Sequence, residues 1–183
     1  LEDPRLLPYF HLSLQSGNDL ILKRMKRRHT HKQAVSFCNK VKKIRKDVVF
    51  GADIIAGFPT ETENMFFDSI SLIKKCDLTH LHIFPYSPRE STPAAKMPQL
   101  PIDIIKDRAK KLRNIGEKNL SRYLKSQIGG KARMLVEQSN TEGSLGKTQH
   151  FAKVYIKQKI SEGSIVDCKI QNVNKDTLQA VLI

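Results

Sequence analysis

Residues 53–62 have the sequence DIIAGFPTET, in which an apolar stretch runs into a turn of glycine, proline and threonine. The apolar stretch begins near Val48, and its length and β-branched side chains are typical of a buried strand. Residues 11–17 (HLSLQSG) and 82–93 (HIFPYSPRESTP) also pass from an apolar stretch into a polar loop. Because ligand sites in α/β proteins lie at the carboxyl ends of strands, the three loops are predicted to form one wall of a single site.

Amphipathic segments connect the three predicted strands, which we place at residues 9–14, 48–56 and 79–86. One helix is expected from residue 18 to about residue 27, and a second begins at Thr30, which forms a capping-box pattern with Gln33. Thr60 and Glu63 form the same pattern before a third helix. The apolar stripes of the second and third helices comprise Ala34, Phe37, Cys38, Val41 and Ile44, and Phe66, Phe67, Ile70 and Ile73. This alternation predicts parallel strands joined by crossover helices.

The second half of the chain changes in character. Prolines between residues 85 and 101 predict a loop without regular structure. A long helix is expected from residue 102 to about residue 124, weakened at Gly116, with a buried side of Ile105, Ala109, Leu112 and Leu120. Beyond Gly129 and Gly130, short stretches rich in β-branched residues lie at 132–138, 144–150, 152–159, 164–173 and 177–183. The predicted fold class is therefore α/β, with a sheet domain at residues 1–126 and a small five-stranded β-barrel at residues 127–183.

Composition points to a polyanionic partner. The net charge of the 183 residues is +14, and residues 23–46 hold eleven basic side chains without a single acid. Such a stretch favours nucleic-acid binding over an ordinary solvated helix face. No apolar run approaches the roughly 18 residues that a membrane span needs, so we expect no membrane partner. Three widely spaced cysteines favour the reducing cytoplasm over a secreted, disulfide-bonded protein.

Four motifs carry a family resemblance: HLSLQSGND at residues 11–19, LKRMKRRHT at 22–30, DIIAGFPTETE at 53–63, and FPYSPREST followed by PAAKM at 84–97. Together they resemble the C-terminal half of the radical S-adenosylmethionine methylthiotransferases that act on tRNA. The wording HLHIFPYS at residues 80–87 is more similar to the threonylcarbamoyladenosine branch than to the isopentenyladenosine branch. Gly146, Lys147 and Thr148, followed by Phe151 and Val154, resemble the RNA-binding TRAM domain. The resemblance implies the C-terminal half of a radical SAM partial (βα) barrel followed by a TRAM-like barrel.

By this resemblance, the full enzyme adds a methylthio group to C2 of a modified adenosine, threonylcarbamoyladenosine, next to the anticodon of tRNA. It would use S-adenosylmethionine and 4Fe–4S clusters. The family's CxxxCxxC cluster motif is absent, because Cys38, Cys76 and Cys168 lie far apart. We therefore expect a fragment that is inactive without its N-terminal half or an electron donor. The alternatives are a non-catalytic tRNA-binding module, a truncated gene remnant, or an enzyme that modifies a ribosomal protein.

The resemblance also implies a set of cofactor-binding residues: Gln15, Ser16, Arg27, Asp53, Gly57, Pro59, Glu61 and Tyr86. Gln15 and Ser16 offer hydrogen-bonding groups suited to a ribose, and a guanidinium such as that of Arg27 can grip a carboxylate. Asp53 lies in an apolar strand, where a carboxylate needs a partner or a ligand. The structural alternatives are a turn glutamine, a helix-capping serine, a surface arginine and, for Glu61, a first-turn acid of a helix. The family usually has glycine where this chain has Thr60 and Ser91.

Eight further residues are predicted to contact the tRNA substrate: Arg24, Arg28, Arg89, Thr92, Lys131, Lys147, Thr148 and Lys153. The barrel region holds eight basic and five acidic residues, an ordinary density, so its RNA binding rests mainly on the resemblance. No residue is assigned a catalytic role. His80 and His82 fall on the same side of a strand, but the six histidines show no metal-ligand spacing, so no metal site is expected. The motifs GxxxxGK[ST], HExxH and GxSxG are absent, which leaves no support for an NTPase, a zincin or a serine hydrolase.

Overall fold

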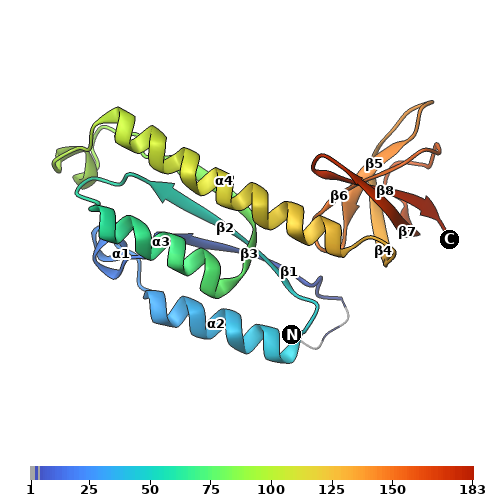
Figure 1. The fold of residues 1–183 in the computed structure, drawn as a ribbon, viewed down its shortest axis with the longest axis horizontal. Helices are drawn as coiled ribbons and strands as arrows, with labels where there is room; N and C mark the ends of the chain where they lie inside the picture. The colour runs from blue at the N-terminus through green and yellow to red at the C-terminus, as the bar shows by residue number, and fades with distance from the viewer. Residues whose placement is uncertain (1–2, 4) are drawn as a thin grey trace. The chain divides into compact units, whose positions relative to one another are not determined.

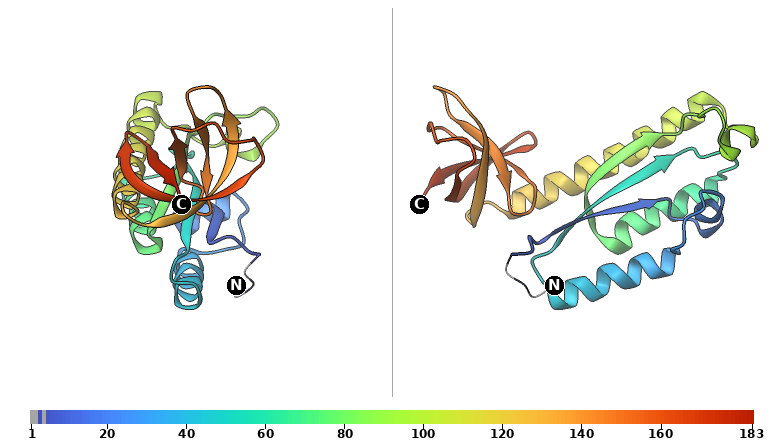
Figure 2. Two further views of the ribbon diagram at one scale, coloured as in Figure 1. Left: turned by 90° about the vertical axis from the view of Figure 1, so that its right-hand side faces the viewer. Right: turned by 180° about the vertical axis from the view of Figure 1, so that it is seen from behind.

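The computed structural model describes residue 3 and residues 5–183, and it divides into two compact units (Figures 1 and 2). Residues 10–117 form the sheet unit. Residues 118–183 form the barrel unit, together with the described residues before residue 10. Contacts thus group residues 118–126 with the barrel, while the domain boundary between residues 126 and 127 stays a prediction. None of the described helices is long and apolar enough to cross a membrane.

The sheet unit has three strands in the order β1 (Tyr9–Gln15), β2 (Val49–Ala56) and β3 (Leu78–Pro85). Two connections supply the helices α1 (Asp19–Arg24), α2 (His31–Ile44) and α3 (Glu63–Cys76). Strands β2 and β3 pair in parallel, with Asp53 opposite His82 and Ile55 opposite Phe84. The predicted α/β class with parallel pairing is confirmed.

The helix starts show how well local capping signals work. The capping box of Thr30 and Gln33 is present at the start of α2. The box predicted for Thr60 and Glu63 is wrong, because Glu63 is the first residue of α3 and Thr62 is its N-cap. Thr60 instead takes the left-handed conformation, with a φ of 68°. It therefore belongs to the turn after β2 and does not begin the helix.

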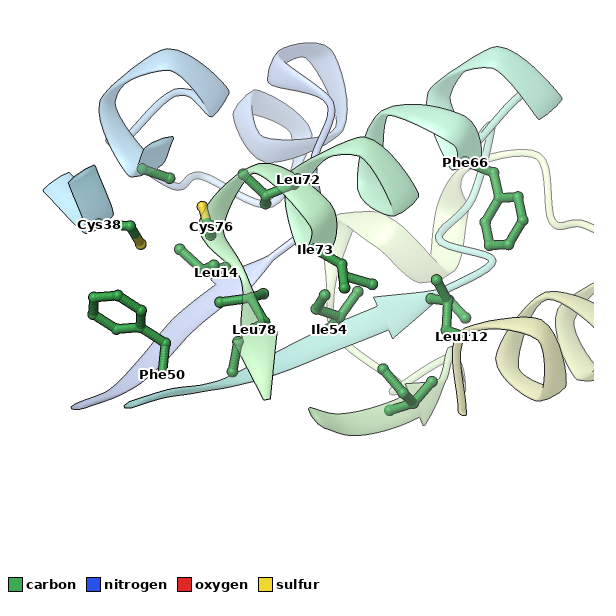
Figure 3. Close-up of a cluster of buried hydrophobic side chains, with 14 of the residues drawn as sticks. Leu14, Cys38, Phe50, Ile54, Phe66, Leu72, Ile73, Cys76, Leu78 and Leu112 are labelled. Atoms are coloured by element: carbon green, nitrogen blue, oxygen red, sulfur yellow. The ribbon is translucent and has the colours of Figure 1, made fainter. Parts of the chain in front are cut away.

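The core of the sheet unit lies on the face of the sheet that the helices cover (Figure 3). Phe50 and Ile54 of β2 are fully buried there among side chains of α2 and α3. The predicted stripes are too wide, because Phe37, Ile44 and Phe67 are exposed. An apolar stripe marks the side that can be buried, whereas the width of the contact depends on the curvature of the neighbouring elements. The alternate residues of β2 and β3, including Asp53 and His82, point to the opposite face of the sheet.

Helix α4 (Ile102–Ser126) runs without interruption through Gly116, which was expected to weaken it. A Cβ at Gly116 would lie 3.1 Å from Cβ of Leu81, so the glycine allows close approach of the helix to β3. Ile105, Ala109 and Leu112 are buried as predicted. The proline-rich segment before α4 is not entirely irregular, because Pro93–Lys96 form the short 3-10 helix η1, capped by the side chain of Thr92.

The barrel unit is a closed five-stranded barrel, as the sequence predicted. Its strands are β4 (Lys131–Ser139), β5 (Ser144–Thr148), β6 (Lys153–Ile156), β7 (Ile165–Asn174) and β8 (Thr177–Leu182), in the order β4-β5-β6-β8-β7. Strands β6 and β8 pair in parallel, and all other neighbouring strands pair antiparallel. The pairing of β4 with β7 closes the barrel. Strands β5 and β6 are shorter than expected, because Thr148 and Ala152 close a turn with Phe151 at a φ of 61°.

The interior of the barrel unit is filled by Met134, Val154, Ile156, Cys168 and neighbouring apolar residues. Leu124, from the last turns of α4, is fully buried in the same cluster. The helix end therefore supplies part of the barrel's own core.

Candidate functional site

A cavity of about 550 Å³ opens at the carboxyl ends of the three strands in the sheet unit. Seven of the residues singled out in the sequence line it: Gln15, Arg24, Arg27, Asp53, Tyr86, Arg89 and Thr92. They come from strands β1 and β2, from the end of α1 and the residues after it, and from the loop after β3, as expected for a site at the ends of parallel strands. Ile55, Phe58 and Phe84 add an apolar wall. A cavity with one apolar side and several cationic or amide groups is suited to a small ligand with both a ring and an anionic group.

The backbone around this cavity is strained at four non-glycine residues, because Gln15, Lys26, Thr60 and Ser91 all have positive φ angles between 57° and 68°. Two of them, Gln15 and Lys26, line the cavity directly. Left-handed conformations cost free energy in residues other than glycine and cluster at functional sites. The same angles account for the glycines that the resembled family has at positions 60 and 91.

The three arginines at and after the end of α1 have different surroundings. Arg24 lines the cavity, and its Nη1 donates a hydrogen bond to Oγ1 of Thr60, which ties α1 to the turn after β2. Arg27 also lines the cavity, and its side chain makes no hydrogen bond or ion pair within the described part of the chain. Arg28 is exposed and does not line the cavity. Arg27 is therefore the cation best placed to bind an anionic group of a ligand.

Tyr86 carries a polar atom without a partner. Its ring packs edge-on against Phe58, with 5.3 Å between the ring centroids, and its backbone N–H donates to the carbonyl oxygen of Ala56. The hydroxyl is buried and has no hydrogen-bond partner among the described residues. Burial also raises the pKa of this hydroxyl. Because buried hydroxyls are nearly always satisfied, the Tyr86 hydroxyl is available to bond a group or a water in the cavity.

Four of the predicted cofactor residues do not line the cavity: Ser16, Gly57, Pro59 and Glu61. The Ser16 hydroxyl is buried and accepts a hydrogen bond from the backbone N–H of Asn18. At Gly57 the φ is 74°, and a Cβ there would lie 2.8 Å from a side-chain carbon of Ile105. The close approach at Gly57 is therefore to α4 of this chain.

Glu61 is part of a buried ion pair. Its Oε2 atom accepts hydrogen bonds from Nη1 of Arg108, at 2.8 Å, and from the backbone N–H of Gly57, at 3.0 Å. Arg108 also donates to the backbone carbonyl of Glu61 and pairs with Glu63. Burial raises the pKa of Glu61, and the bonds from Arg108 and Gly57 offset part of that rise. These contacts join the turn after β2 to α4, so they fix the position of the turn next to the cavity.

On the rim of the cavity, Thr92 caps η1 and its hydroxyl donates to the backbone carbonyl of Arg89 at 2.8 Å. The Arg89 side chain is exposed. The loop after β3 is thus ordered by its own hydrogen bonds and presents a cation at the edge of the cavity.

Asp53 has two partners that the sequence analysis missed. Its Oδ1 atom lies 2.8 Å from Nε2 of His11 and 3.3 Å from Nδ1 of His82. The three residues lie on β1, β2 and β3, in one row across the uncovered face of the sheet. The spacing of the histidines in the sequence could not reveal this row, because it depends on how the strands pair. Within each strand, the alternation of side chains predicts which residues share a face of the sheet. It does not predict which residues of the neighbouring strands lie beside them.

The predicted RNA contacts in the barrel unit are spread over its surface. Lys147 pairs with Glu137 at 3.6 Å and lies over the ring of Phe151, and Lys153 pairs with Asp176 at 2.8 Å. Lys131 is exposed opposite Lys169 in the pairing of β4 and β7. Thr148 is buried, so its side chain belongs to the barrel core.

The sequence was compared with family models and with known proteins. The Radical SAM superfamily model matches residues 3–73. The chain is 45% identical to the threonylcarbamoyladenosine tRNA methylthiotransferase MtaB of Rickettsia prowazekii, over 98% of this chain and 42% of that protein. It is 30% and 33% identical to the tRNA-2-methylthio-N(6)-dimethylallyladenosine synthases of Ehrlichia chaffeensis and Ehrlichia canis, over 99% and 98% of this chain and 42% of each relative.

The chain thus spans about two fifths of the length of these curated relatives. Both kinds of relative are named for methylthio chemistry on tRNA or for the modified adenosine itself. Over nearly its whole length, the chain is similar to part of these tRNA-modifying enzymes, and residues 3–73 match the Radical SAM superfamily.

Proposed function

We propose that the chain is part of an enzyme that adds a methylthio group to C2 of threonylcarbamoyladenosine next to the anticodon of tRNA. The 45% identical relative is named for this modified adenosine, whereas the relatives named for dimethylallyladenosine are 30–33% identical. The motif HLHIFPYS at residues 80–87 supports the same threonylcarbamoyladenosine branch. The reaction class is group transfer by S-adenosylmethionine radical chemistry.

The observation that carries this proposal is the cavity at the strand ends, with the unpaired hydroxyl of Tyr86 and the unpaired guanidinium of Arg27. S-adenosylmethionine has an adenine ring, a ribose diol and an aminoacyl carboxylate. Ile55 and Phe58 offer an apolar surface for a ring, and the amide of Gln15 lies at the end of β1. The residues present therefore fit this cofactor.

In this assignment, Arg27 pairs with the carboxylate of the cofactor, Gln15 hydrogen-bonds the ribose, and the Tyr86 hydroxyl gains a partner. The apolar wall excludes water from that side of the cavity, which strengthens the polar contacts inside it. Bound S-adenosylmethionine supplies the radical with which the reaction begins. The role of this chain is to bind and orient the cofactor. None of these side chains is assigned a proton or electron transfer.

The cysteines do not fit a 4Fe–4S cluster. Cys38 and Cys76 are buried in the core of the sheet unit, and Cys168 is buried in the barrel unit. The thiols of Cys38 and Cys76 are hydrogen-bonded neighbours, but a cluster needs further thiolates at the same point, and Cys168 belongs to the other unit. We therefore place the cluster ligands outside this chain, in an N-terminal half of the enzyme that is its proposed protein partner together with an electron donor.

The second proposed partner is the anticodon stem–loop of tRNA, in the cytoplasm. The eleven basic residues between 23 and 46 support it, since few of them are paired with acids: Lys42 pairs with Asp77, and Arg45 with Asp47. Arg28 and Arg89 are exposed near the cavity and are assigned phosphate contacts. Such contacts supply affinity and orientation without reading the sequence of the RNA.

Binding of a labelled anticodon stem–loop to the purified chain, measured by fluorescence anisotropy over a salt series, tests both partners. We expect affinity to fall as salt rises and to increase when S-adenosylmethionine is present. Arg27→Ala should abolish the effect of the cofactor. Its neighbour Arg28→Ala should keep that effect while lowering the salt slope by about one.

A second pair of variants separates the pocket from the surface. Tyr86→Phe should weaken cofactor binding about fivefold to tenfold, because one hydrogen bond contributes roughly 1 kcal/mol. Tyr155→Phe is the matched control, since the Tyr155 hydroxyl donates to the carbonyl of Glu142 in the barrel unit. Salt-dependent RNA binding that ignores S-adenosylmethionine would favour a tRNA-binding module without a cofactor site. Absence of RNA binding would contradict the proposed function.

A further inference from the structure

We propose that His11, Asp53 and His82 form a binding site for a divalent transition-metal ion of the zinc type. One residue comes from each strand of the sheet, and all three side chains meet on the face that the helices leave uncovered. This site shares Asp53 with the lining of the cavity, but it uses neither the cluster nor the cofactor of the proposed function.

The distances suit a single ion. One donor atom from each of the three side chains lies within 4.8 Å of the other two. The carboxylate Oδ1 of Asp53 is 2.8 Å from Nε2 of His11 and 3.3 Å from Nδ1 of His82. A tetrahedral zinc ion with bonds of about 2.0–2.2 Å places neighbouring ligand atoms roughly 3.3–3.6 Å apart. An ion can therefore be bound if the side chains of His11 and Asp53 move apart and the two imidazoles turn toward one point.

The donor set selects the class of metal. Two imidazole nitrogens and one carboxylate oxygen are the ligands of zinc, cobalt and non-haem iron sites, whereas magnesium and calcium prefer oxygen alone. Asp53 offers one negative charge to the ion, and the two imidazoles bind it in their neutral form. The set is therefore matched to a divalent cation that forms strong bonds to nitrogen.

The supporting scaffold is rigid, and the site is accessible. Asp53 lies directly opposite His82 in the parallel pairing of β2 and β3, and the imidazole rings of His11 and His82 are 4.9 Å apart. The His82 side chain is 61% exposed and those of His11 and Asp53 about a quarter to a third, at 31% and 26%. Three protein ligands leave one coordination position open, as in zinc sites that bind a water or a substrate group. Asp53 also lines the cavity, so the metal site borders the proposed pocket.

Metal binding is measured on the untagged full chain after removal of metals with a chelator. Titration with Co²⁺, followed by visible absorption, and with Zn²⁺, followed by calorimetry, should show one ion per chain. His11→Ala, His82→Ala and Asp53→Asn should each weaken Zn²⁺ binding at least tenfold. Far-UV circular dichroism checks that each variant keeps its fold.

His80→Ala is the matched control. His80 lies two residues before His82 on β3 and faces the same side of the sheet, but its partner on β2 is Gly51 and not a carboxylate. Its removal should leave the affinity for Zn²⁺ unchanged. His82→Cys should retain the ion, because a thiolate is also a zinc ligand, and should add a thiolate-to-cobalt charge-transfer band.

Binding of less than one ion per chain would overturn the site, as would unchanged affinity in the His11→Ala and His82→Ala variants. A His82→Cys variant that binds Co²⁺ without the charge-transfer band would exclude position 82 as a source of a ligand. None of these results depends on tRNA or S-adenosylmethionine, so failure here leaves the proposed function intact, and failure of the proposed function leaves the metal site standing.

Discussion

The sheet unit and the barrel unit bury their apolar residues in different ways. In the barrel unit, each of the five strands has two neighbours, so the sheet closes and has no free edge. In the sheet unit, β1 and β3 are edge strands among the described residues, and the helices cover one face only. The closed unit therefore has a complete core of its own, whereas the open unit exposes a face of polar and apolar side chains at which a ligand can bind. The unit that is less complete as a fold is the one that carries the candidate sites.

The largest expected effect comes from dividing the chain. A fragment of residues 118–183 should fold alone and stay monomeric, because its strands satisfy one another and Leu124 completes its core. The sheet unit by itself should associate or precipitate, since an exposed sheet edge is a template for further pairing. Circular dichroism and size-exclusion chromatography of the two fragments test this. One sharp, cooperative unfolding transition of a monomeric full chain would contradict the expected independence of the units.

Arg108→Ala should destabilise the sheet unit by about 3–5 kcal/mol, because it leaves the buried carboxylate of Glu61 without its ion-pair partner. Urea unfolding followed by hydrogen exchange can assign the loss to one unit. The control is Lys111→Ala, which removes an exposed pair with Asp107 and should cost at most about 1 kcal/mol. Equal losses in the two variants would mean that Arg108 is not a structural link between α4 and the turn after β2.

Leu124→Ala should destabilise the barrel unit by about 2–5 kcal/mol, the usual cost of deleting a fully buried leucine side chain. The sheet unit should be unaffected. The same reasoning predicts that a fragment beginning at residue 127 is less stable than one beginning at residue 118. If the two fragments unfold at the same urea concentration, the end of α4 is not part of the barrel's core.

The smallest expected effect concerns the turn after β2. Thr60→Gly should stabilise the sheet unit by about 1 kcal/mol, because a β-branched residue is strained at a φ of 68° and glycine is not. Thermal unfolding measures the change. Thr62→Gly is the opposing control, since it removes the N-cap of α3 and should lower stability. A destabilised Thr60→Gly variant would show that the hydrogen bond from Arg24 to Thr60 outweighs the backbone strain.

Much of the fold could be predicted from the sequence, because its signals are local. Alternating and helical apolar periods placed the strands and the long helix, and polar turns separated the five barrel strands. The capping box at Thr30 was predicted correctly because both of its partners lie within one helical turn. The box at Thr60 was predicted wrongly, since the position of Thr60 depends on contacts of Glu61 and Arg24 with distant residues. Phe37 and Phe67 were placed on the buried stripes but are exposed. An apolar stripe in the sequence does not reveal how far the packed neighbouring elements extend over it.

The sequence by itself determined the order of elements, the excess of positive charge and the motifs that relate this chain to tRNA methylthiotransferases. Those properties depend on the residues and their near neighbours along the chain. Only the tertiary structure decided that Arg27 and Tyr86 line one cavity, that Glu61 supports it from behind, and that His11, Asp53 and His82 meet. His11 and His82 lie 42 and 29 positions from Asp53 in the sequence, and strand pairing brings them together. The register of that pairing is set by the packing of the whole sheet and cannot be read from any one segment.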